Sequence, residues 1–200
     1  MPQPRQDHSS PGDLPLVPPL EKRWQAFLTE LDRRDGCVMG HSENVCRLAV
    51  QIGRTLALAE AELALIATGA LMHDIGKVFI QSRVLAKPTR LSESEWETIR
   101  LHPALGEALL TANLFEEAVL DIVRWHHERW DGCGYPDGLG GASIPLGARI
   151  VAAADAFSAM LETRPYRAAL YLDDAMEELR RTSWTQLDGD CVGALLESLD

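Results

Sequence analysis

LALIATGALMHDIGKV, residues 63–78, is the stretch that decides the fold. Its apolar residues recur at the spacing of one helix face, at Leu63, Ile66, Ala67 and Ala70. This pattern predicts a helix from about Glu60 to Met72, followed at once by the pair His73 and Asp74. Taken alone, that pair could be a cation at a helix C-terminus beside an acid.

Helical patterns continue on both sides of this stretch. Ser92 and Glu95 have the spacing of a reciprocal N-terminal cap, and Pro103 should end that helix near His102. Asp173 is the expected N-cap of the last predicted helix. The other predicted helices contain Trp24 to Leu31 with an end near Asp35-Gly36, Val45 to Leu56, Val119 to His126, and Ile150 to Leu161. No strand pair or internal repeat is evident, so we expect an all-α fold.

Length and composition indicate an ordinary globular protein. The 200 residues are 46% hydrophobic and 24% charged, and residues 1–19 contain six prolines. We therefore expect a flexible arm over residues 1–19 and a single domain over residues 20–200. No apolar run is long enough to span a membrane and the N-terminus lacks a signal sequence, so the expected location is the cytoplasm.

The charge and the cysteines exclude some functions. A net charge of −11 disfavours binding to polymeric nucleic acid, although a few local cations could still hold a small phosphorylated ligand. The four cysteines have no CxxC spacing, which argues against a disulfide framework or a thiolate zinc site.

Histidines and acids occur on apolar helix faces. His41 lies four residues before Val45 on its stripe, His126 extends a second stripe, and Asp155 stands among alanines. Each could be a structural residue, and His126-His127 could be one inward and one solvated ring. Burying several such groups is costly unless they are paired or bound to metal, and their joint placement favours a metal centre.

The donor types narrow the chemistry. Imidazole and carboxylate without thiolate suit Fe, Mn, Zn or Ni. Asp74 can bridge two ions through its two oxygens, and two bridged ions can hold a hydroxide and neutralise a phosphoryl group. Hydrolysis of a phosphate ester is the expected reaction.

Several motifs then resemble a known family. The chain contains the motifs HDIGK at 73–77, HP at 102, HHERWDGCGYPDGL from 126, IPLGARIVAAADAF from 144 and RPYR at 164–167. Together they are similar to the HD-GYP branch of the His-Asp phosphohydrolases, over about residues 35–185. The resemblance implies a helical bundle with a glycine-rich loop at residues 131–145. It also implies cleavage of cyclic di-GMP to pGpG, GMP or both, by attack of a metal-bridging hydroxide.

The resemblance also implies roles for individual residues. Asp74 and Lys77 would be catalytic, with two divalent ions, Fe or Mn, and with Zn or Ni as alternatives. The ligand would be cyclic di-GMP or a related cyclic dinucleotide, and a protein partner such as a diguanylate cyclase is left open. The implied substrate-binding residues are Lys77, Tyr135, Arg164 and Arg167. The implied metal ligands are His41, His73, Asp74, His102, His126, His127 and Asp155.

Three positions depart from the family pattern. Cys37 stands where some members have a glutamate for a third metal, which favours two ions here. Ser158 replaces an aspartate, which we expect to weaken a contact that orients Asp155. The segment WTQLDGD, residues 184–190, alters local packing. Two rival functions therefore stay open: a cyclic dinucleotide receptor or partner-docking module without turnover, and a phosphohydrolase for another nucleotide.

Overall fold

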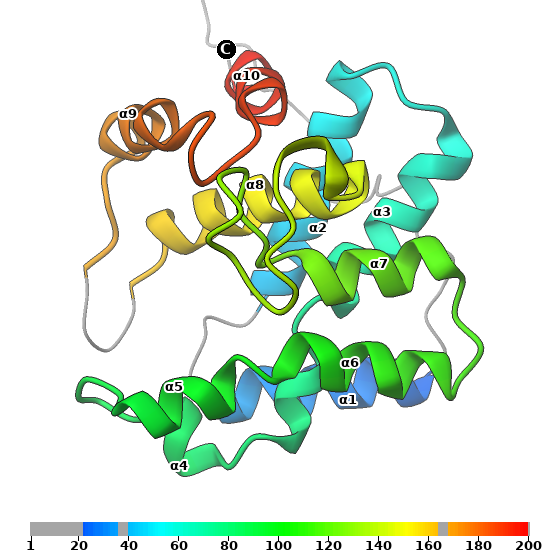
Figure 1. Ribbon diagram of the computed structural model, residues 1–200, viewed down its shortest axis with the longest axis vertical. Coiled ribbons are helices and arrows are strands. Elements are labelled where there is room, and N and C mark those ends of the chain that lie inside the picture. Colours follow the sequence, from blue (N-terminus) through cyan, green and yellow to red (C-terminus); the bar gives the residue numbers. More distant parts are fainter. Residues whose placement is uncertain (1–21, 36–39, 164–167, 200) are drawn as a thin grey trace, which may run out of the picture.

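The computed structural model describes residues 22–35, 40–163 and 168–199 (Figure 1). These residues form helices and no strand, apart from one isolated bridge between Ser183 and Leu187. The expected all-α class is confirmed. The proline-rich segment 1–19 and Cys37 lie outside the described residues. None of the helices described is long and apolar enough to cross a membrane.

The helices have the following bounds. The elements are α1 (Lys22–Asp35), α2 (His41–Thr55), α3 (Glu60–Met72), η1 (Ile75–Phe79), α4 (Ser82–Leu85), α5 (Glu93–Ile99), α6 (His102–Thr111), α7 (Glu117–Trp125), η2 (Gly141–Ser143), α8 (Leu146–Leu161), α9 (Leu172–Thr182) and α10 (Gly189–Glu197). The bounds expected for α3 agree with those observed.

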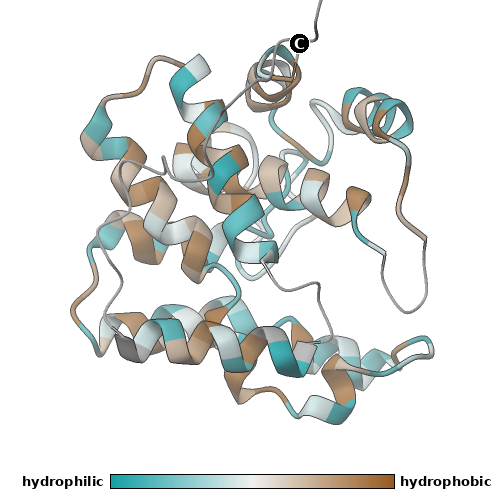
Figure 2. Cartoon of the chain, turned by 180° about the vertical axis from the view of Figure 1, so that it is seen from behind, coloured by the Kyte–Doolittle hydropathy of each residue, from teal (hydrophilic) through white to brown (hydrophobic). Residues whose placement is uncertain are grey.

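Helix α2 lies at the centre of the larger apolar core. It packs against α3, α8 and α10, and side chains such as Ile52, Phe157 and Leu195 are fully buried there. A second apolar cluster joins Trp24, Met72 and Ile75 to residues of α6 and α7. Figure 2 shows apolar and polar stretches alternating along the helices, as expected for elements with one buried face. The two clusters hold the ends of α2, α3, α6, α7 and α8 in fixed positions.

Gly76 allows the backbone of η1 to lie in direct contact with the backbone of α6. A Cβ atom at this position would lie 2.0 Å from the carbonyl oxygen of His102 and 2.6 Å from the backbone nitrogen of Gly106. Only a residue without a side chain fits there. The segment that carries His73 and Asp74 can therefore lie directly against the first turn of α6.

The helix predicted from Ser92 ends earlier than expected. The reciprocal cap is confirmed, because Ser92 Oγ accepts from the Glu95 amide and Glu95 Oε2 accepts from the Ser92 amide. Helix α5 stops at Ile99, and a new helix begins at His102 with Pro103 in its first turn. Proline starts a helix readily, since the amide proton that it lacks would have no intrahelical partner there.

The expected cap at Asp173 is wrong. Helix α9 begins at Leu172 with Tyr171 at the N-cap, and Asp173 lies in the first turn. An acidic side chain in the first turn is favoured by the helix dipole, so Asp173 does mark the helix start, but the expected cap was placed two residues too late. Helices α4, α6 and α10 were not predicted.

Substituting Gly76→Ala should destabilise the protein by about 3 kcal/mol or more, because the new methyl group meets rigid backbone. The matched control is Gly193→Ala in α10, where a Cβ atom would meet nothing within 4 Å. That control should raise stability by about 0.5–1 kcal/mol, through the lower entropy of the unfolded chain. Urea unfolding measures both, and equal stabilities would contradict the close approach.

Candidate metal centre

Seven histidine and aspartate side chains meet where these helix ends converge. They form two groups, and within each group the donor atoms lie within 4.8 Å of one another. One group is Asp74, His102, His126 and His127, and the other is His41, His73 and Asp155. The structure thus brings together all seven residues that the sequence had marked as candidate ligands.

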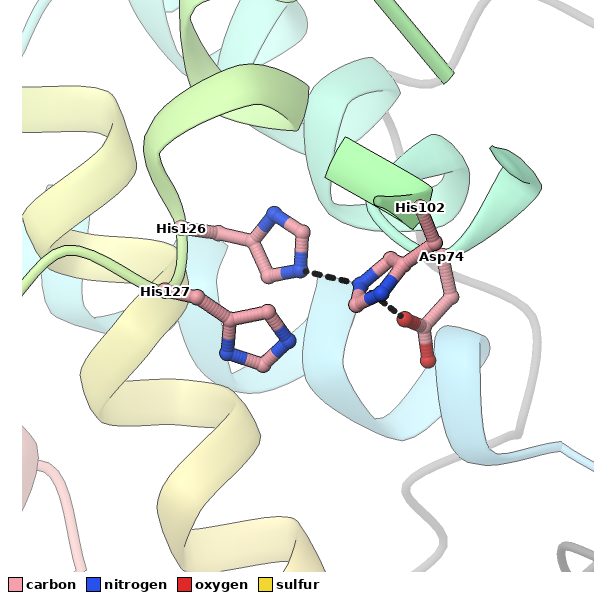
Figure 3. Close-up of side chains that lie close together, drawn as sticks. All are labelled: Asp74, His102, His126 and His127. Atoms are coloured by element: carbon pink, nitrogen blue, oxygen red, sulfur yellow. Dashed lines mark hydrogen bonds and ion pairs between the residues drawn. The ribbon is translucent and has the colours of Figure 1, made fainter. Parts of the chain in front are cut away.

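The first group is drawn in Figure 3, where the rings of His102, His126 and His127 point toward one another. The Nε2 atom of His102 lies 3.2 Å from Oδ1 of Asp74 and 3.4 Å from Nε2 of His126. These residues come from the start of α6, the end of α7 and the turn after α3. Donors from three elements therefore converge on one point.

The second group lies on the other side of Asp74. Nε2 of His41 is 3.2 Å from Oδ1 of Asp155, and the rings of His41 and His73 are 5.6 Å apart between centroids. Nε2 of His73 is 3.2 Å from Oδ2 of Asp74. The two carboxylate oxygens of Asp74 therefore face different groups: Oδ1 faces His102 of the first group, and Oδ2 faces His73 of the second.

Three of the histidines are oriented by backbone carbonyls. In each, Nδ1 donates to the carbonyl oxygen of the residue three positions earlier, in the last turn of a helix, where carbonyls lack intrahelical partners. This bond leaves Nε2 as the atom that faces the centre. The bonds run from His73 to Ala70 at 2.7 Å, from His102 to Ile99 at 2.6 Å, and from His126 to Val123 at 2.8 Å.

The protonation states in the first group suit metal coordination. Burial, with a smaller effect from the neighbouring His102 ring, lowers the pKa of His127 to about 3, and burial together with His127 lowers the pKa of His126 well below its usual value. Burial by itself would raise the pKa of Asp74, but Lys77 and His73 outweigh it and hold that pKa far below its usual range. Neutral imidazoles and an ionised carboxylate are the forms that bind metal.

The buried Nε2 atom of His73 also supports metal binding at this cluster. The side chain of His73 is fully buried, and its Nε2 atom, 3.2 Å from Oδ2 of Asp74, makes no hydrogen bond of good geometry within the described residues. A buried polar atom without a hydrogen bond is costly, and a metal ion would satisfy it. The donor set therefore fits a metal ion.

Two of the residues expected to contact a ligand, Lys77 and Tyr135, lie beside this cluster. Nζ of Lys77 is 2.8 Å from Oδ2 of Asp74. The Tyr135 ring stacks on His127, with centroids 4.9 Å apart, and the Arg100 guanidinium lies 5.7 Å from the Tyr135 centroid. Arg100 was missed from the sequence, because no motif marked it.

Arg164 and Arg167, the other two expected ligand-binding residues, lie outside the described residues. Their role stays a prediction from the sequence.

Glu128 fixes the glycine-rich loop against the centre. Its side chain is only 4% exposed, and Oε1 accepts from the backbone amides of Asp137 at 2.7 Å and Gly138 at 2.9 Å. The Tyr135 amide also donates to the carbonyl oxygen of His127. The loop that carries Tyr135 is thus attached to the segment that carries His126 and His127.

The expected weakness at Ser158 takes a different form. Ser158 Oγ donates to Glu162 Oε1 at 2.9 Å, and that same oxygen accepts from His41 Nδ1 at 2.8 Å. A carboxylate therefore lies next to the centre, supplied four residues later by the C-cap of α8. Sequence reasoning missed Glu162, since nothing local marks it as close to His41.

With this geometry established, the family can be assigned. The HD domain model matches residues 25–191. The chain belongs to the HD domain family. HD domain phosphohydrolases are metal-dependent, and the histidine and aspartate cluster of this chain is of a kind that can hold a metal ion.

Curated relatives of this HD domain are longer proteins. It is 41% identical over 183 residues to the cyclic di-GMP phosphodiesterase response regulator of Xanthomonas campestris, covering 88% of this chain and 48% of the relative. It is 36% identical over 181 residues to 3'3'-cGAMP-specific phosphodiesterase 3 of Vibrio cholerae, covering 90% and 39%. The chain thus spans about half the length of these relatives, or less.

Solved structures share the fold. The HDG"Y"P protein from Bdellovibrio bacteriovorus superposes with a TM-score of 0.66 at 20% identity, over 80% of this chain and 51% of that one. A cyclic GMP-AMP specific phosphodiesterase of Vibrio cholerae gives 0.69 at 21%, over 88% and 48%. The expected helical bundle of the HD-GYP type is confirmed.

Replacing Glu128 with alanine should loosen the glycine-rich loop. Loss of two hydrogen bonds to a charged acceptor should speed amide exchange at Asp137 and Gly138 about tenfold or more. Glu128→Gln, which keeps an acceptor oxygen, should have a smaller effect. Hydrogen exchange measured by mass spectrometry on the loop peptide is the readout, and an unchanged rate in Glu128→Ala would contradict this role.

Proposed function

We propose that the chain is a metal-dependent phosphodiesterase that hydrolyses cyclic di-GMP to pGpG, GMP or both. The observation that carries the proposal is the placement of Asp74, whose two oxygens lie 3.2 Å from histidines of the two different groups. A carboxylate shared in this way is suited to bridge two ions, and paired ions are suited to phosphate esters.

The two groups define which residues would hold each ion. His41, His73 and Asp155 would bind one, while His102, His126 and His127 would bind the other, with Asp74 shared between them. Iron or manganese is the proposed metal, with zinc or nickel as alternatives, because neither group of donors found among the described residues contains a thiolate. When bound, the ions would supply an activated water and neutralise charge on the phosphoryl group.

The chain's own residues would position the substrate. The ammonium group of Lys77, held beside Asp74, would stabilise negative charge that develops on the scissile phosphate. Tyr135 offers an aromatic wall that is stacked on His127, and Arg100 adds a cation beside it. Arg164 and Arg167 are proposed from the sequence to hold the non-scissile phosphate.

The relatives support a cyclic dinucleotide as substrate. Those from Xanthomonas campestris and Thermotoga maritima are named cyclic di-GMP phosphodiesterases, with 41% and 36% identity to this chain. The 36% identity to a cGAMP-specific enzyme makes 3'3'-cGAMP the second candidate. A diguanylate cyclase as protein partner stays a prediction from the family resemblance.

The rival function is a receptor that binds the dinucleotide without cleaving it. The gathering of all seven candidate ligands favours turnover, because a receptor would have no need for an aspartate shared between two groups of donors.

Wild-type protein loaded with Mn²⁺, or with Fe²⁺ without oxygen, should convert cyclic di-GMP to pGpG or GMP in a chromatographic assay. Asp74→Ala should lose both turnover and bound metal, since the shared carboxylate is gone. A competing panel of 3'3'-cGAMP and a mononucleotide identifies the preferred substrate. Binding without product by the fully metallated protein would favour the receptor instead.

Lys77→Ala should lower kcat about 100- to 1000-fold, the usual effect of removing a group that stabilises developing charge. Metal content per chain serves as the control, and it should stay at the wild-type level. Lys77→Arg, which keeps the charge, should lose less. A kcat unchanged in Lys77→Ala would remove the lysine from the proposed mechanism.

A further inference from the structure

His41 differs from the other oriented histidines in what holds its ring. In His73, His102 and His126, the Nδ1 atom donates a hydrogen bond to the backbone carbonyl of the residue three positions earlier. His41 instead donates from Nδ1 to a side chain 121 residues away, Oε1 of Glu162, at 2.8 Å. Its other nitrogen, Nε2, faces Asp155.

The position of His41 in its helix explains this difference. It is the first residue of α2, and the free backbone groups at a helix N-terminus are N–H donors, while free carbonyls occur at the C-terminus. Helix α2 therefore has no unpaired carbonyl next to this ring. An acceptor for Nδ1 has to come from another element.

The C-terminal part of α8 and its C-cap supply that acceptor. Asp155 and Ser158 are three residues apart on α8 and so lie on one face of it, and Glu162 is the C-cap that follows its last residue, Leu161. Asp155 is the candidate ligand, and the buried Ser158 hydroxyl donates to Glu162 Oε1 at 2.9 Å. The glutamate is thereby held in place for His41.

We propose that Glu162 is the positioning residue of the His41, His73 and Asp155 half of the metal centre. Its carboxylate fixes the tautomer and the ring plane of His41, so that Nε2 is aimed at the ion, and Ser158 braces the carboxylate. A charged acceptor also makes Nε2 a stronger donor to the metal. This inference rests on the proposed function only in that the cluster holds metal.

Glu162→Ala tests the proposal by metal binding. Metal-free protein is titrated with Mn²⁺, and free Mn²⁺ is followed by electron paramagnetic resonance. Affinity at one of the two sites should fall about 10- to 100-fold, the usual effect of removing an outer-shell partner of a ligand. Glu177→Ala, on the exposed side of α9, is the matched control and should bind as wild type. Circular dichroism checks that both variants fold.

A second variant separates positioning from simple loss of packing. Ser158 Oγ lies 3.4 Å from His41 Nδ1, so a carboxylate at position 158 is within reach of the ring. The double variant Ser158→Asp with Glu162→Ala should recover most of the lost affinity. Glu162→Gln, which accepts a hydrogen bond without charge, should fall between wild type and Glu162→Ala.

The outcomes are distinct from those that test the enzyme activity. Unchanged Mn²⁺ affinity in Glu162→Ala would overturn the proposal, and so would a loss that Ser158→Asp leaves unrepaired. Failure of the wild-type protein to cleave cyclic di-GMP would reject the phosphodiesterase, while the metal titrations would still decide the role of Glu162.

Discussion

The buried carboxylate of Asp74 is the interaction on which the rest of the site depends. Burial opposes its charge, yet Lys77, His73 and His102 surround it and keep it ionised. Because its two oxygens face different groups of histidines, the elements that carry those groups must keep fixed positions relative to one another. Gly76 makes this possible, since only a glycine lets η1 approach the first turn of α6 so closely.

Backbone groups at helix ends orient three of the histidines in the cluster. Carbonyls in the last turns of α3, α5 and α7 accept from the Nδ1 atoms of His73, His102 and His126. The unpaired backbone groups that every helix leaves at its end thus become supports for side chains. His41 lies at a helix start, where no such carbonyl exists, and Glu162 takes over that function.

Local patterns predicted much of the fold and of the site. The apolar spacing of residues 60–72 gave the bounds of α3, and the capping pair Ser92 and Glu95 was correct, because such signals depend on near neighbours. The end of α5 and the cap of α9 were misplaced by a few residues. Helix boundaries depend on small differences in free energy between adjacent residues, so these errors are of the expected size.

The sequence by itself determined the helical class, the HD motif and the seven side chains that gather at the centre. Tertiary structure alone decided how they are divided into two groups, and that Glu128, Arg100 and Glu162 support or flank them. The physical reason is distance along the chain. A hydrogen bond between His41 and Glu162 joins residues 121 positions apart, and only the packing of α2 against α8 brings them together.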